Sequence, residues 1–128
     1  MDIIALIVTG SFAVLNFFAG AVKAFTPWSK LQDIMPWTET TGKGPAYVAA
    51  GAELIGSIGA LLPLILANTL DGWSWAVWIS LAAVIGLVII QVLAIGVHVK
   101  RDEIHALRTN IALIILGIAA VGLIVATA

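Results

Sequence analysis

Four long runs of apolar residues dominate the chain, and polar residues interrupt them only at scattered positions. A helix of about 20 apolar residues spans the roughly 30 Å hydrocarbon core of a bilayer. Each run reaches that length, and none carries the wide polar face of a helix that lies against water. The pattern therefore predicts transmembrane helices over residues 3–25, 45–68, 73–99 and 109–128.

The first connection between these runs contains a shorter periodic pattern. Trp28, Leu31, Ile34 and Met35 recur at helical spacing, with polar residues on the opposite side. This pattern is typical of a short amphipathic helix on the membrane surface. The helix would either cover the mouth of the bundle or serve as a simple interfacial anchor. We expect an all-α fold, a transmembrane four-helix bundle that forms a single domain over residues 1–128.

Composition supports an integral membrane protein. Hydrophobic residues make up 62% of the chain and charged residues 10%, whereas soluble domains have about 45–50% and about 25%. The bilayer is therefore the first expected partner. A net charge of −1 gives no general attraction to nucleic acid. The absence of cysteine excludes disulfides and thiol redox chemistry by this chain alone.

The basic residues indicate an orientation. All 6 lie at the first and third connections, and the termini and the second connection have none. The positive-inside rule places basic connections in the cytoplasm. We therefore expect four crossings with both termini outside the cytoplasm. The basic residues are Lys23, Lys30, Lys43, Lys100, Arg101 and Arg108.

Glu53 is the most informative polar residue, because it lies inside the second apolar run. A charged side chain at the centre of a bilayer costs roughly 2.5–3.5 kcal/mol on insertion scales. Asn16 and Gln91 occupy a similar expected depth, so we predict a deep polar layer of these three residues. The layer could line a functional cavity. Alternatively, Glu53 could form a structural ion pair or stay protonated, and the amides could only link helices by hydrogen bonds.

A second polar layer is expected nearer the cytoplasmic surface, with Lys23, His98, Arg101, Glu103 and Asn110. A cavity that opens inward between the helices would connect the two layers. We expect Lys23 to lie beside Glu53, directly or through Asn16. Simpler roles are that Lys23 extends to the headgroups, that His98 marks a helix end, and that Arg101 belongs to a solvated charge cluster.

Several other chemistries find no support in the sequence. His98 and His105, even with Glu103 nearby, match no metal-site spacing, so no metal is expected. The glycines of the second run lie in a membrane helix and not in a nucleotide-binding loop. No serine has an elbow motif. Catalytic residues cannot be assigned, and any redox role would need a bound quinone or another subunit.

Several sequence fragments, in order along the chain, resemble the DoxX-like family of small four-helix membrane proteins. The fragments are FAGAVK at 18–23, GAELIGSIG at 51–59 followed by Leu62-Pro63, the end of the third helix at His98, Lys100, Arg101 and Glu103, and Asn110 in the fourth helix. The resemblance implies a polytopic protein of a bacterial-type inner membrane. It also implies a shared polar site of Lys23, Glu53, His98 and Asn110.

The family takes its name from a subunit associated with a thiosulfate:quinone oxidoreductase, and relatives are linked to oxidative-stress complexes and to assembly. The resemblance therefore favours an accessory or small redox-linked subunit that binds a lipid-soluble molecule such as a quinone. Lys23 or His98 would donate to a quinone oxygen, and Glu53 would hold or relay a proton. The candidate ligand-binding residues are Lys23, Glu53, His98, Asn110, Asn16, Gln91 and Arg101.

Two other functions remain open at this point. The chain could be a scaffold or assembly factor, within a larger membrane complex or a homo-oligomer, in which the polar layer only fixes helix packing. It could also be a small transporter of protons or a metabolite, although no broken-helix repeat is evident.

Overall fold

The computed structural model describes residues 2–128, which form helices joined by short turns. Four of the helices are long and apolar enough to cross a membrane, which confirms the predicted bundle. The elements in chain order are α1 (Ile3–Phe25), α2 (Trp28–Ile34), α3 (Trp37–Thr41), α4 (Lys43–Thr69), the 3₁₀ helix η1 (Ser74–Ala76), α5 (Val77–Lys100) and α6 (Ile104–Thr127).

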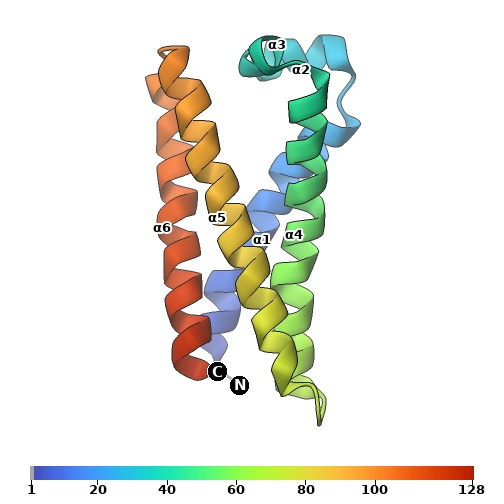
Figure 1. The fold of residues 1–128 in the computed structure, drawn as a ribbon, viewed down its shortest axis with the longest axis vertical. Coiled ribbons are helices and arrows are strands. Elements are labelled where there is room, and N and C mark those ends of the chain that lie inside the picture. Colours follow the sequence, from blue (N-terminus) through green and yellow to red (C-terminus); the bar gives the residue numbers. More distant parts are fainter. Residues whose placement is uncertain (1) are drawn as a thin grey trace.

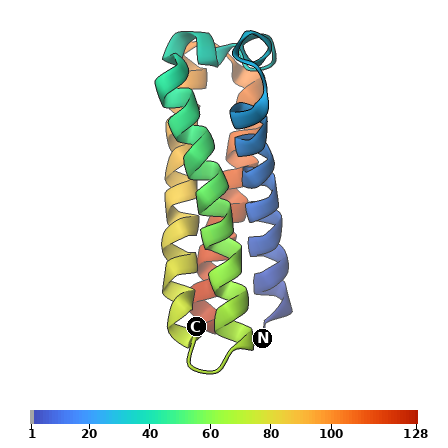
Figure 2. The same ribbon diagram turned by 90° about the vertical axis from the view of Figure 1, so that its right-hand side faces the viewer.

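The long helices form a ring in which α1 packs against α4, α4 against α5, α5 against α6, and α6 against α1. Figures 1 and 2 show both termini at the end of the bundle that carries the α4–α5 turn. We call this the termini end. The opposite end carries α2, α3 and the α5–α6 turn, and we call it the α2–α3 end.

Large apolar side chains cover the outside of the ring, as a hydrocarbon solvent requires. Ile55, Phe18 and Ile115 are among those exposed. The backbone polar groups are satisfied within the helices, which is the condition for crossing a bilayer. The outward side chains therefore match a lipid-facing surface.

The apolar core fills the half of the bundle nearer the termini. Phe12, Val84, Leu87 and Ile124 are buried there between the helices. Gly56 allows α4 and α5 to approach closely at this level, since a Cβ on Gly56 would lie 2.8 Å from Leu87 Cδ2. The buried charged and amide side chains are concentrated in the other half of the interior.

The fourth long helix begins earlier in the sequence than predicted. It begins at Ile104, whereas the apolar run begins at residue 109. The first turns of α6 are polar because they lie at the end of the bundle, where hydropathy does not reveal a helix. This change moves Asn110 deeper into the helix than its place in the sequence suggested.

The first connection contains the predicted short helix, α2, and also a second one, α3. Leu31 of α2 is fully buried, which fixes α2 against the bundle. Pro36 precedes α3 with φ −57°, and Thr38 Oγ1 donates a 2.7 Å hydrogen bond to the Met35 carbonyl. Gly42, with φ 81°, ends α3 and allows the chain to turn into α4.

Candidate functional site

A buried ion pair between α1 and α4 is the centre of the candidate site. Lys23 Nζ donates to Glu53 Oε1 across 2.6 Å, and the two residues are only 8% and 2% exposed. This confirms that the residues are neighbours, and it shows that Lys23 does not extend to the headgroups. Gly20 makes the approach possible, because a Cβ there would lie 2.9 Å from both the Ala50 carbonyl oxygen and Glu53 Cβ.

A chain of side-chain amides crosses the bundle beside this pair. Asn110 Nδ2 donates to Gln91 Oε1 across 2.8 Å, and Gln91 Nε2 donates to Asn16 Oδ1 across 3.1 Å. Asn16 Nδ2 then donates to the Phe12 carbonyl across 2.8 Å. We call these three side chains the amide relay. It links α6, α5 and α1, and it corrects the predicted layering, since Asn110 belongs with the deep residues.

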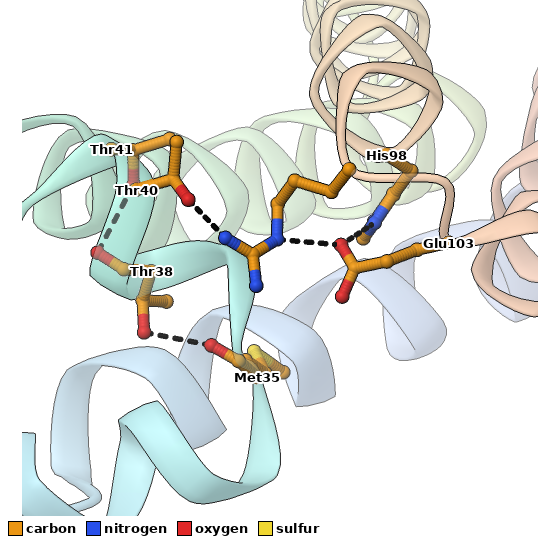
Figure 3. A network of polar contacts seen from close by, with 7 residues as sticks. Met35, Thr38, Thr40, Thr41, His98 and Glu103 are labelled. Carbon is orange, nitrogen blue, oxygen red and sulfur yellow. Dashed lines mark hydrogen bonds and ion pairs between the residues drawn. The ribbon is translucent and has the colours of Figure 1, made fainter.

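A smaller polar cluster closes the α2–α3 end. Glu103 Oε1 lies 3.1 Å from both His98 Nδ1 and Arg101 Nε. Arg101 Nη1 also donates to Thr40 Oγ1 of α3 (Figure 3). We call the Arg101 contacts with Thr40 and Glu103 the Arg101 clasp. It ties the α5–α6 turn to α3, so Arg101 is more than a member of a solvated charge cluster.

Trp37 is part of the site, although nothing in the sequence singled it out as a site residue. Its ring centroid lies 5.8 Å from Lys23 Nζ and 6.4 Å from the His98 ring, which it meets edge to face. The first contact has the geometry of a cation–π interaction. No pattern in the sequence gives the direction of this side chain, because α3 is too short to show a periodicity.

A cavity of about 680 Å³ lies between the helices at this level. Small-molecule sites in proteins typically measure about 300–1,000 Å³. The walls are mostly apolar and come from all four long helices and the α2–α3 segment, residues 28–41. The polar side chains of the lining are those of Lys23, Thr41, Glu53, Gln91, His98, Glu103, Thr109 and Asn110.

The cavity includes most, but not all, of the residues that the sequence singled out. Lys23, Glu53, Gln91, His98 and Asn110 line it. The other two candidates lie outside the lining: Asn16 is fully buried beyond Gln91 in the amide relay, and Arg101 holds the clasp.

One oxygen of the site has no partner. Glu53 Oε2 is buried, and no donor among residues 2–128 forms a hydrogen bond with it. Ser57 does not serve this atom, because its hydroxyl donates to the Glu53 backbone carbonyl. A buried acceptor without a donor is costly. Glu53 therefore belongs to the cavity wall with one carboxylate oxygen buried and unpaired.

The fold and the site together define a class: a small polytopic membrane protein with a mainly apolar cavity between four helices and a buried ion pair in its wall. Residues 7–122 match the DoxX-like family. The match covers most of the chain, so the protein belongs to the DoxX-like family.

A second similarity is partial. The chain is 45% identical over 62 residues to a cadmium, cobalt and zinc/H(+)-K(+) antiporter of Bacillus velezensis. The similar region covers 48% of this chain and 18% of the antiporter. No solved structure matches the chain.

Proposed function

We propose that this DoxX-like protein binds a quinone in its cavity and acts as an accessory or small redox-linked membrane subunit. The observation that carries the proposal is the buried Lys23–Glu53 pair on the wall of an otherwise mainly apolar cavity of about 680 Å³. An ion pair that only clamps two helices requires no cavity beside it. A ligand with an apolar body and a few polar atoms uses both features.

The lining offers the contacts that a quinone headgroup requires. A lysine ammonium carries three N–H donors, and Lys23 uses only one of them in its hydrogen bond to Glu53. Lys23 can therefore donate to a quinone oxygen, and His98 offers a second polar contact on another wall. Trp37 adds an aromatic ring beside Lys23. In this arrangement Glu53 holds or relays a proton.

The proposed binding site lies in the cytoplasmic half of the membrane. The basic residues predict that the α2–α3 end faces the cytoplasm, which would place the cavity in the inner leaflet of a bacterial-type inner membrane. The bilayer then serves as the reservoir of the ligand. A larger membrane complex would supply the electron-transfer partner, since the chain has no cysteine.

The test compares wild-type protein with the double variant Lys23→Met/Glu53→Gln. The two changes remove both charges together, so no buried charge is left alone and the fold is largely preserved. Quinones and lipids extracted from each purified sample are measured by mass spectrometry, and thermal unfolding checks the fold. Glu39→Gln, the same change on an exposed residue of α3, is the matched control.

We expect quinone to co-purify with wild type and with Glu39→Gln, and to be lost from the double variant. The absence of a specifically bound small molecule from wild-type protein would contradict the proposal. If the double variant also assembled poorly with a co-purifying membrane protein, a scaffold role would replace it, with the amide relay as the packing device.

Transport is the second candidate, and the partial similarity to the antiporter is the observation that favours it. The similar region covers only 18% of that protein, so its activity does not transfer to this chain as a whole. Among residues 2–128, no three His, Asp or Glu side chains are grouped as a metal site would require. Cation flux in proteoliposomes, dependent on Glu53, would support transport.

A further inference from the structure

The four-helix ring is tight at one end and open at the other. Near the termini end, α4 and α5 are in close contact: Gly56 faces Leu87, and the Ser80 hydroxyl donates to the Ala60 carbonyl. Toward the α2–α3 end, Figure 1 shows α5 diverging from α4. There α4 stays against α1, where Gly20 provides the close contact.

The cavity occupies the space between the diverging helices and reaches the outer surface. The most exposed large apolar side chains of its lining are Val48 of α4, at 72%, and Leu93 of α5, at 66%. Both are apolar and lie within helices that cross the membrane. We call the gap between them the α4–α5 opening. It connects the cavity sideways with the region that hydrocarbon chains would occupy.

The α2–α3 segment lies at the end of the cavity that points toward water. Met35, Pro36 and Trp37 contribute to its lining from the α2–α3 segment. The Arg101 clasp holds this segment to the α5–α6 turn. The α4–α5 opening is therefore the more direct route for an apolar molecule, and a long chain on a bound ligand can leave through it.

The polar wall adds a requirement for the headgroup. Lys23 and Glu53 neutralise each other, so the wall favours an uncharged ligand. Glu53 Oε2 is a buried acceptor without a donor. A carbonyl oxygen cannot satisfy it, because both groups are acceptors, whereas a hydroxyl group can donate to it.

We propose that the preferred ligand is an uncharged, hydroxyl-bearing molecule with an apolar chain, of the hydroquinone class. Its hydroxyl donates to Glu53 Oε2, and its chain leaves through the α4–α5 opening between Val48 and Leu93. The inference rests on the proposed function and deepens it, because it specifies the reduced form of a quinone and its direction in the site.

The first test measures the affinity of full-length protein in lipid nanodiscs for two probes, under anaerobic reducing conditions. One probe is a decyl-substituted hydroquinone, and the other is its dimethyl ether, which keeps the oxygens but has no donor. The hydroquinone should bind at least about tenfold more tightly, since the ether leaves the buried carboxylate oxygen unpaired. This comparison uses wild-type protein and needs no variant.

The Glu53→Gln variant should invert this preference. Its amide oxygen takes the place of Oε1 opposite Lys23, so the amide NH₂ group occupies the place of Oε2. A donor then replaces the acceptor. The ether should bind this variant as tightly as the hydroquinone or more tightly. Thermal unfolding confirms that the variant is folded before its affinities are measured.

The second test concerns the route of the chain. Leu93→Trp places bulk at the α4–α5 opening, and Val92→Trp places the same bulk on the neighbouring exposed residue, which does not line the cavity. Leu93→Trp should weaken the binding of decyl hydroquinone about tenfold or more, because displacing even two or three methylene groups of its chain costs this much affinity. A methyl-substituted hydroquinone without the chain should bind both variants equally.

The outcomes separate this inference from the proposed function. Equal affinity of wild type for the hydroquinone and its ether would overturn the donor requirement while quinone binding stands. Tighter binding of the oxidised quinone than of the hydroquinone would also overturn the donor requirement. That result would show that the Glu53 carboxyl group is protonated and donates to the ligand. Equal loss in both tryptophan variants would overturn the chain route. Failure of every probe to bind would contradict the proposed function itself.

Discussion

Lys23 and Glu53 form an ion pair in which both side chains are buried. Their 2.6 Å contact compensates two charges that would each be expensive alone. The carboxylate uses one oxygen for this contact and keeps the other unpaired. A residue pair optimised only for stability would have both oxygens satisfied, so the unpaired oxygen supports the proposal that the pair forms one side of a binding site.

The single variants Glu53→Gln and Lys23→Met should each lower the free energy of unfolding by about 3–5 kcal/mol, because each leaves one buried charge without its counter-charge. The double variant should lose less free energy of unfolding than either single variant, because it leaves no buried charge alone. Thermal and denaturant unfolding in detergent measure the cycle. Strictly additive losses would show that the two groups do not interact.

The sequence reveals some residues of the site and hides others for a physical reason. Glu53 can be recognised from the sequence because a charged residue inside an apolar run is costly whatever the arrangement of the other helices. Asn110 was placed in the wrong layer, because its depth depends on where α6 begins. Trp37 was missed as a site residue, because its direction depends on how α3 packs against the bundle.

Helix α1 approaches α4 closely only because Gly20 has no side chain. We predict that Gly20→Ala destabilises the bundle by about 1–3 kcal/mol, since the added methyl group meets the backbone oxygen of Ala50. Gly86→Ala is the control, because a Cβ on Gly86 of α5 meets nothing within 4 Å. Unfolding in detergent should show a loss for the first change and none for the second.

Helix α3 depends on the Arg101 clasp for its position. Exposed ion pairs contribute only about 0–1 kcal/mol, so Arg101→Gln should leave global stability almost unchanged. It should instead accelerate amide hydrogen exchange in α3, at Thr38 to Thr41, through local opening. Lys100→Gln, a neighbouring change outside the clasp, is the control. Unchanged exchange in α3 would show that the clasp does not hold the segment.

The elements were predictable to different degrees. The long helices follow from the thickness of a bilayer, and the predicted range 3–25 equals α1 (Ile3–Phe25). A hydropathy pattern does not detect the polar ends of helices. This explains why α6 begins earlier than predicted. Helix α3 has a short, threonine-rich sequence with no apolar period, so the sequence alone does not predict it.

The bundle as a whole has an apolar end and a polar end, and the basic residues lie toward the polar end. The positive-inside rule predicts that this end is cytoplasmic. An alkaline phosphatase fused after Ala128 should be active, whereas green fluorescent protein at the same position should not fluoresce. The reverse pair of results would invert the orientation and move the cavity to the outer leaflet.

The cavity could not have been measured from the sequence. A polar layer was predictable from Glu53, Asn16 and Gln91, but the space beside it arises because α5 diverges from α4. That divergence is a property of all the helix contacts together. The sequence therefore indicated a polar layer, and the structure supplies the shape and the lining of the cavity beside it.

The central claim is that a quinone-type ligand occupies this cavity, and photo-crosslinking locates such a ligand directly. Protein in nanodiscs is irradiated with an azido-quinone carrying a decyl chain, and the labelled peptides are identified by mass spectrometry. We predict labelling within residues 34–53 and 90–98, suppressed by an excess of unlabelled decyl quinone. Labels spread over the lipid-facing surfaces of α1 and α6, unaffected by the competitor, would contradict the account.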